Sequence, residues 1–237
     1  MAPQWESEGI VSEPTTTPPS RRLQRIALPA LLVVALASFL SAVFLPLPWK
    51  NKLPPPTETM PPVPEFTLTE RFEKPVSKAD LTGKVWVASF MFTRCGGPCP
   101  RVTATMTRLQ GELDLANQSD LRFVTFTMDP ERDTPEVLRR YATDRAKAHP
   151  EKWLFLTGEE AAMLKLIKDG FLIGVSKSTD PKPGFEFNHS TYLVVVDKQG
   201  RIRGHFNGFP GEHDAEGSQY EESLSRLKAK VGDLLKE

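Results

Sequence analysis

The chain has two cysteines, Cys95 and Cys99, separated by Gly96, Gly97 and Pro98. A pair at this spacing can hold a soft metal ion, cycle between a dithiol and a disulfide, or cross-link a short loop. A cross-link over so few residues restricts the unfolded chain little and therefore stabilises the fold little. The spacing thus favours a metal site or a redox pair.

His189 is the candidate third ligand of such a metal site. It lies 90 positions after Cys99 and opens an apolar strand pattern, where a histidine can equally be a surface or capping residue. Two thiolates and one imidazole form a soft set of low coordination number that suits copper, above all Cu(I) with Cu(II) as the second state, whereas structural zinc usually has a fourth ligand. The other histidines lie at a helix end, in a hairpin and in a polar loop: His149, His205 and His213.

The cysteines stand between a strand pattern and a helix pattern. Residues 85–92 and 121–128 form apolar runs of strand length, as expected for strands covered on both faces. Between these runs apolar residues recur at helical spacing: Val102, Met106, Leu109 and Leu113. Cys99 therefore falls in or beside the first helical turn, where unpaired N–H groups and the helix dipole stabilise a thiolate.

Strand and helix signals continue to alternate toward the C-terminus. Pro135 follows two candidate N-cap residues, Asp133 and Thr134, and so predicts a helix start. The further predicted elements are a strand at 153–156, a helix from about 159, an irregular stretch at 174–188, strands at 192–196 and 201–206, and an amphipathic helix striped by Tyr220, Leu224, Leu227, Val231 and Leu234. This is the order of an α/β, thioredoxin-like domain over residues 63–237, with a mixed central sheet flanked by helices, although the order alone would also fit other three-layer folds.

The N-terminal part predicts a single transmembrane helix with two low-complexity flanks. Residues 26–45 carry no charge and would span about 30 Å as a helix, the thickness of a bilayer's hydrocarbon core. Three arginines between positions 21 and 25 place the N-terminus in the cytoplasm by the positive-inside rule. Residues 1–25 are then a disordered cytoplasmic tail, and the proline-rich residues 46–62 are a stiff linker. A signal sequence cleaved after residues 35–37 is the alternative.

The segment Cys95-Gly96-Gly97-Pro98-Cys99 resembles the Cys-Gly-Pro-Cys motif of thioredoxin-like oxidoreductases with one glycine inserted. The insertion moves the second sulfur round the helix and changes the disulfide ring, so the redox behaviour of the shorter motif does not transfer directly. Those proteins also place a cis-proline before the strand that faces the cysteines. Ser190 or Thr191 stands at that position here, so the copper and the redox interpretations both remain open.

Four segments then stand in a specific order: residues 64–68 (PEFTL), 90–100 with both cysteines, 128–134 (MDPERDT), and His189-Ser190 before the strand that ends at Asp197. Together they resemble the SCO/SenC family of copper chaperones for cytochrome c oxidase assembly, over about residues 63–220. Members of that family are membrane-anchored thioredoxin-like domains that bind copper through two cysteines and one histidine. The resemblance therefore implies Cys95, Cys99 and His189 as copper ligands.

The resemblance also implies that Asp129 lies beside the site, where a carboxylate could orient the histidine or a partner's ligand. An aspartate before a proline also commonly does no more than shape a turn. The departure from the family is Gly96-Gly97-Pro98, where Pro-Asp-Val or Pro-Asp-Ile is usual, and this change can alter copper affinity, redox potential or partner choice. Met91, Met106 and Met128 are expected to pack in the core rather than to bind metal.

We expect a copper-delivery protein rather than an enzyme, which passes copper by ligand exchange to the dicopper centre of a cytochrome c oxidase subunit. The alternative is a thiol-disulfide oxidoreductase that reduces the cysteines of that subunit or of another extracytoplasmic partner. A redox or copper sensor is a third hypothesis. A thiol reductant or another copper chaperone would be a further partner.

The 30 basic and 30 acidic residues balance, so the charge does not favour a nucleic-acid partner. The predicted anchor places the domain at the inner membrane facing the periplasm. The alternative is the mitochondrial inner membrane, with the domain facing the intermembrane space.

Overall fold

The computed structural model describes residues 60–211 and 217–237. The predicted tail (1–25), the predicted anchor (26–45) and all but the last three residues of the predicted linker (46–62) lie outside the described residues. Within the described part, no helix has both the length and the apolar character needed to cross a membrane.

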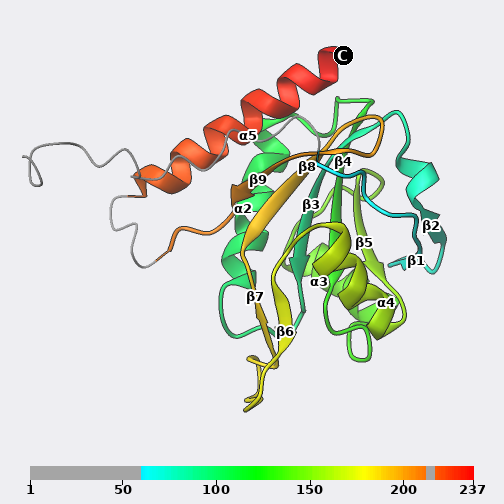
Figure 1. Ribbon diagram of the computed structural model, residues 1–237, viewed down its shortest axis with the longest axis vertical. Helices are drawn as coiled ribbons and strands as arrows, with labels where there is room; N and C mark the ends of the chain where they lie inside the picture. Colours follow the sequence, from blue (N-terminus) through cyan, green and yellow to red (C-terminus); the bar gives the residue numbers. More distant parts are fainter. Residues whose placement is uncertain (1–59, 212–216) are drawn as a thin grey trace, which may run out of the picture. The chain divides into compact units, whose positions relative to one another are not determined.

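A seven-stranded mixed sheet forms the centre of the domain, in the order β2-β1-β5-β4-β3-β8-β9 (Figure 1). The strands β3, β4 and β5 are parallel, and the pairs β3–β8, β8–β9, β1–β5 and β1–β2 are antiparallel. The strands are β1 (Thr67–Glu70), β2 (Pro75–Ser77), β3 (Val85–Met91), β4 (Leu121–Thr127), β5 (Trp153–Thr157), β8 (Tyr192–Val196) and β9 (Ile202–Asn207). The predicted mixed sheet is confirmed.

Two crossover helices cover one face of this sheet. The connections β3-α2-β4 and β4-α3-β5 run in the same direction along the sheet, and right-handed crossovers then place α2 (Cys99–Glu112) and α3 (Pro135–Asp144) on the same face. The hydroxyls of Thr103 and Tyr141 join the two helices at 2.8 Å. The C-terminal helix α5 (Ser218–Lys236) lies beside α2, to which the Arg108–Glu221 ion pair ties it (Figure 1).

The opposite face is covered by the chain that follows β5. There α4 (Glu160–Lys165) continues into one π-helical turn, η2 (Leu166–Gly170). Earlier in the chain, a short 3-10 helix, η1 (Lys78–Leu81), precedes β3. Phe171 follows η2 and packs its ring against Trp86, Phe90 and Phe126, with centroid distances of 5.8, 5.1 and 4.9 Å. Because helices cover both faces, every residue of β3 is buried, as its apolar run predicts.

The expectation that residues 174–188 are irregular is wrong at both ends of the stretch. It contains most of an antiparallel ribbon, β6 (Val175–Lys177) and β7 (Phe187–His189), which projects beyond the main sheet (Figure 1). Each strand of the ribbon has only three residues, which are too few to show an apolar alternation in the sequence. His189 therefore ends β7 instead of opening the next strand.

Candidate metal centre

The loop between β3 and α2 carries Cys95, and Cys99 is the first residue of α2. The carbonyl of Pro98 accepts hydrogen bonds from the N–H groups of Arg101 and Val102, at 3.0 and 3.1 Å, and so begins the helix at the second cysteine. The predicted place of Cys99 in the first helical turn is confirmed. Cys99 is fully buried and Cys95 is partly exposed, so the two sulfurs differ in how readily a partner reaches them.

The fold brings His189 to the two cysteines. The two sulfurs and one imidazole nitrogen all lie within 4.8 Å of one another, and His189 Nε2 is 3.3 Å from Cys99 Sγ. His189 Nδ1 lies 2.9 Å from the carbonyl oxygen of Ser190, which can only accept, so Nδ1 carries the proton. The lone pair of Nε2 is therefore free and faces the sulfurs, as a metal-binding histidine requires.

The cysteines hold one proton between them. The hydrogen bond from the Cys99 thiol is the largest influence and lowers the pKa of Cys95 to about 4, against the effect of burial and with smaller help from the backbone N–H groups of Cys99 and Gly97. The same hydrogen bond, together with burial and the charge of Cys95, raises the pKa of Cys99. The Cys95 thiolate is thus formed at neutral pH, and a soft cation would have to displace only the Cys99 proton to meet two thiolates.

The two glycines between the cysteines lie under the tip of the β6–β7 ribbon. The N–H of Gly96 donates to the carbonyl of Gly184 at 2.9 Å. A Cβ on Gly96 would lie 3.3 Å from the Phe185 ring, and a Cβ on Gly97 would lie 3.5 Å from it. Because proline has no N–H, the proline usual at position 96 in the resembling family could not make this hydrogen bond. The two glycines that replace the usual family residues therefore allow the tip of the ribbon to pack on the cysteine loop.

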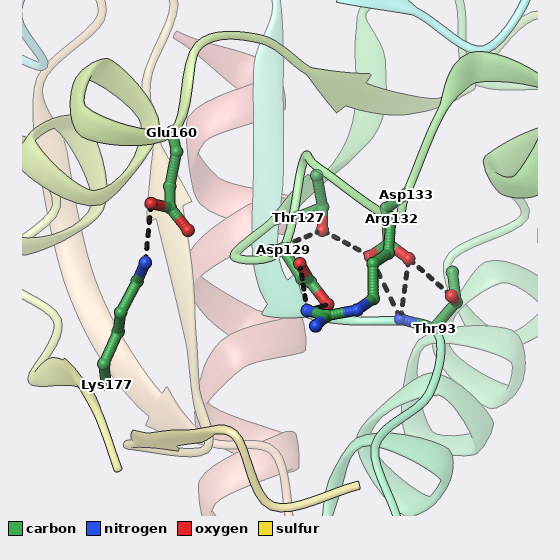
Figure 2. A network of polar contacts seen from close by, with 7 residues as sticks. All are labelled: Thr93, Thr127, Asp129, Arg132, Asp133, Glu160 and Lys177. Atoms are coloured by element: carbon green, nitrogen blue, oxygen red, sulfur yellow. Dashed lines mark hydrogen bonds and ion pairs between the residues drawn. The ribbon is translucent and has the colours of Figure 1, made fainter. Parts of the chain in front are cut away.

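Asp133 anchors the segment that leads into the cysteine loop. Its carboxylate is buried and accepts hydrogen bonds from the Thr93 N–H, the Thr93 hydroxyl and the Thr127 hydroxyl (Figure 2). Thr93 stands two residues before Cys95. The sequence makes Asp133 and Thr134 both candidates for the N-cap of α3, and the structure shows that Thr134 is the N-cap. The only signal in the sequence that Asp133 also anchors the segment before Cys95 was the position of Asp133 in the MDPERDT segment.

Asp129 lies apart from the grouped ligand atoms. Its carboxylate is buried and pairs with Arg132, with Arg132 Nη1 3.1 Å from Asp129 Oδ2 (Figure 2). A second ion pair, between Glu160 and Lys177, joins α4 to β6 in the same region (Figure 2). Asp129 is therefore held by its arginine, and a role beside the metal stays a prediction.

The remaining sequence candidates behave as expected where they are described. Met91, Met106 and Met128 are buried in the core. His149 Nδ1 accepts hydrogen bonds from two backbone N–H groups, and His205 Nε2 lies 2.8 Å from the Phe171 carbonyl oxygen. His213 lies outside the described residues. The described residues contain one cluster of three side chains that could together bind a metal ion: Cys95, Cys99 and His189. A set of two sulfurs and one imidazole fits copper.

Residues 55–219 match the SCO1/SenC family model. A SCO1 protein homolog of Bacillus subtilis is 32% identical over 166 residues, which cover 69% of this chain and 80% of that protein. A SCO1/SenC family lipoprotein from Bacillus anthracis has a solved structure with a TM-score of 0.61 and 30% identity, covering 73% of this chain and 94% of that one.

Two other solved structures are informative. BsSco, described as a member of the Sco family of cytochrome c oxidase assembly proteins with a disulfide switch, has a TM-score of 0.55 and 30% identity, covering 68% of this chain and 92% of its own. Bradyrhizobium japonicum ScoI, solved with copper bound, has a TM-score of 0.55 at 23% identity, covering 68% of this chain and 99% of its own, and shares the fold.

Proposed function

The chain belongs to the SCO1/SenC family, and from this premise we propose that it carries one copper ion on Cys95, Cys99 and His189 and delivers it to the dicopper centre of a cytochrome c oxidase subunit. The observation that carries the proposal is the grouping of two sulfurs and a deprotonated imidazole nitrogen within 4.8 Å. Such a soft, three-atom set suits Cu(I). The named roles of the relatives, oxidase assembly for BsSco and bound copper for ScoI, support this direction.

The unequal burial of the ligands suits delivery rather than storage. Cys95 is partly exposed and lies in a loop, whereas Cys99 is buried at the start of α2. A partner thiolate would therefore replace Cys95 first, while Cys99 and His189 still hold the ion. Stepwise replacement of this kind keeps the copper bound throughout the exchange. A thiol reductant that keeps the pair reduced, or an upstream copper chaperone that loads it, would be a further partner.

Copper transfer tests this proposal directly. Residues 60–237 loaded with one equivalent of Cu(I) are mixed with the copper-free dicopper domain of an oxidase subunit, and copper on each protein is measured after separation. We expect copper to leave this domain for the oxidase domain faster than it leaves a small chelator of equal affinity, because ligand exchange needs no free ion. Transfer that is no faster than from the chelator contradicts delivery, even if the domain binds copper tightly.

The proposal includes the membrane anchor at residues 26–45, with the tail at 1–25 in the cytoplasm and the linker at 46–62. The uncharged run and the arginines before it support this topology. In a bacterial host the domain would then face the periplasm, and in a mitochondrion the same topology would face the intermembrane space.

We expect the full chain to stay in the membrane pellet after an alkaline carbonate wash and to retain its N-terminal residues by mass spectrometry. Residues 60–237, exported behind a cleavable signal, should appear in the soluble periplasmic fraction. If the mature form of the expressed full chain instead begins just after residues 35–37, the segment is a cleaved signal sequence.

A further inference from the structure

A pocket of about 340 Å³ lies between α2 and α3, directly beside Cys95. Besides Cys95, its wall includes Thr93, Thr103, Tyr141 and Arg145. We call it the α2–α3 pocket. Its volume is in the range of small-molecule sites. His189 does not line it, so the pocket meets one thiol of the pair without using the third ligand of the proposed copper site.

The pocket has a positively charged end. Among residues 60–211 and 217–237, the Arg145 guanidinium has no ion-pair or hydrogen-bond partner. A neighbouring hollow of about 220 Å³ shares Tyr141 and Arg145 with the pocket and adds Arg140 and Asp144. Two guanidinium groups against one carboxylate leave a net positive charge there. Arginine binds carboxylates through paired, charge-assisted hydrogen bonds, so this end of the pocket suits a carboxylate.

The hydroxyl groups between the charged end and the sulfur add polar contacts. Thr103 Oγ1 and Tyr141 Oη lie 2.8 Å apart, and each hydroxyl keeps capacity for one further partner. Cys95 precedes the start of α2, Arg145 caps the end of α3, and both helices begin at the same edge of the sheet, so the two residues lie toward opposite ends of the pocket. A ligand that spans the pocket would thus meet a cation at one end, hydroxyls on the way and the Cys95 sulfur at the other end. Cys99 is buried and does not line the pocket, so any exchange with such a ligand begins at Cys95.

We propose that the α2–α3 pocket binds a small disulfide that carries a carboxylate, of the cystine or glutathione disulfide class, and that Arg145 holds its carboxylate while Cys95 attacks its sulfur. This inference goes beyond copper delivery. It uses the two cysteines of the proposed copper site without the copper, and it gives the copper-free dithiol a specific oxidant. Oxidation would join the two sulfur ligands in a disulfide, and the protein could then no longer bind copper through thiolates.

The chemistry is a two-step thiol-disulfide exchange. The Cys95 thiolate attacks one sulfur of the bound disulfide, which forms a mixed disulfide on Cys95 and releases the other half as a thiolate. The Cys99 sulfur then attacks Cys95 Sγ, forms the Cys95–Cys99 disulfide and releases the bound half, which takes up the proton that Cys99 loses. The pair gives up two electrons, and the small disulfide becomes one thiolate and one thiol; the thiolate then takes a proton from water.

The test compares two small disulfides on the full chain in detergent. Oxidation of the reduced, copper-free protein is followed by thiol trapping and mass spectrometry, with glutathione disulfide and with the uncharged bis(2-hydroxyethyl) disulfide. We expect Arg145→Gln to slow the reaction with glutathione disulfide about tenfold, because one charge-assisted contact is lost. The reaction with the uncharged disulfide should change less than twofold. In Cys99→Ser, glutathione should remain trapped on Cys95.

Arg226→Gln is the matched control, because Arg226 is an exposed arginine on α5 and its loss changes the net charge equally. It should leave both rates unchanged. Equal slowing of both disulfides by Arg145→Gln, or no slowing of either, overturns the proposal. Cu(I) affinity measured on the same variant should equal that of the wild type, so a failure of this inference is distinguishable from a failure of copper binding.

Discussion

Replacement of both Cys95 and Cys99 by serine is expected to weaken Cu(I) binding by roughly four orders of magnitude or more. Structural zinc sites with four ligands contribute about 10–16 kcal/mol, or about 3 kcal/mol for each ligand, and we take the same value per ligand for Cu(I). Since each 1.4 kcal/mol is about a tenfold change in affinity, the loss of two sulfur ligands removes at least four decades. The measurement is a titration of reduced residues 60–237 against a Cu(I) chelator of known affinity.

Single replacements separate the roles of the ligands. His189→Ala removes one nitrogen ligand and should weaken binding by roughly a hundredfold on the same basis. His205→Ala is the matched control, because His205 contacts the Phe171 carbonyl rather than the sulfurs, and it should leave the affinity within about threefold. Wild-type affinity that is no higher than that of the double serine variant refutes the copper site. Unchanged affinity in His189→Ala refutes only the third ligand.

Asp133→Ala is expected to destabilise the copper-free domain by about 3 kcal/mol, because it leaves buried donors without their acceptor. These donors are the Thr93 N–H and the hydroxyls of Thr93 and Thr127. Asp133→Asn keeps the shape and one acceptor oxygen and should cost about 1 kcal/mol at neutral pH. Urea unfolding of residues 60–237 measures both effects.

The control for Asp133→Ala is Asp120→Ala, which breaks a surface ion pair with Lys84 and should change the stability little, because solvent screens exposed pairs. If Asp133→Ala costs no more than this control, the buried carboxylate does not hold the cysteine loop. Thr93 stands two residues from Cys95, so Asp133→Ala should also make the Cys95 loop more accessible to alkylation.

Burial is the largest influence on Asp133 and raises the pKa of its carboxyl group, against the effect of its threonine donors. The folded protein therefore keeps the Asp133 proton to higher pH than the unfolded chain does. The stability that this group adds is fully present below the unfolded pKa, near 4, and falls as the pH rises through the folded value. The advantage of wild type over Asp133→Asn in unfolding free energy should shrink as the pH is raised from about 4.

Local chemistry was enough to predict the main elements. The apolar runs at 85–92 and 121–128 became β3 and β4, Pro135 began α3, and the stripe from Tyr220 to Leu234 became the buried face of α5. Each of these signals depends on residues within a few positions of one another, such as a cap, a proline or a helical period. The cysteine pair was also predicted as a metal or redox site from the sequence, because that prediction depends only on the spacing of the two residues and on the chemistry of sulfur.

The tertiary structure decided which side chains meet. Nothing in the sequence near residue 184 shows that its carbonyl accepts the Gly96 N–H, or that Phe185 covers two glycines about 90 positions earlier. Asp133 is likewise an ordinary helix-cap candidate until the fold places it against Thr93. The sequence did not predict the β6–β7 ribbon, because each of its strands has only three residues, too few to show an apolar alternation.

The sequence by itself determined the ligand types and the elements that carry them, because these depend on short-range spacing and on burial. Only the tertiary structure decided that His189 presents its free nitrogen to Cys99, since a hydrogen bond to the Ser190 carbonyl selects the tautomer. It also decided that Cys95 lines the same pocket as Arg145 while Cys99 does not. The tautomer depends on the neighbouring residue Ser190, whereas the approach of His189 to Cys99 and the place of Cys95 at the pocket depend on contacts between segments far apart in the chain, which no local pattern specifies.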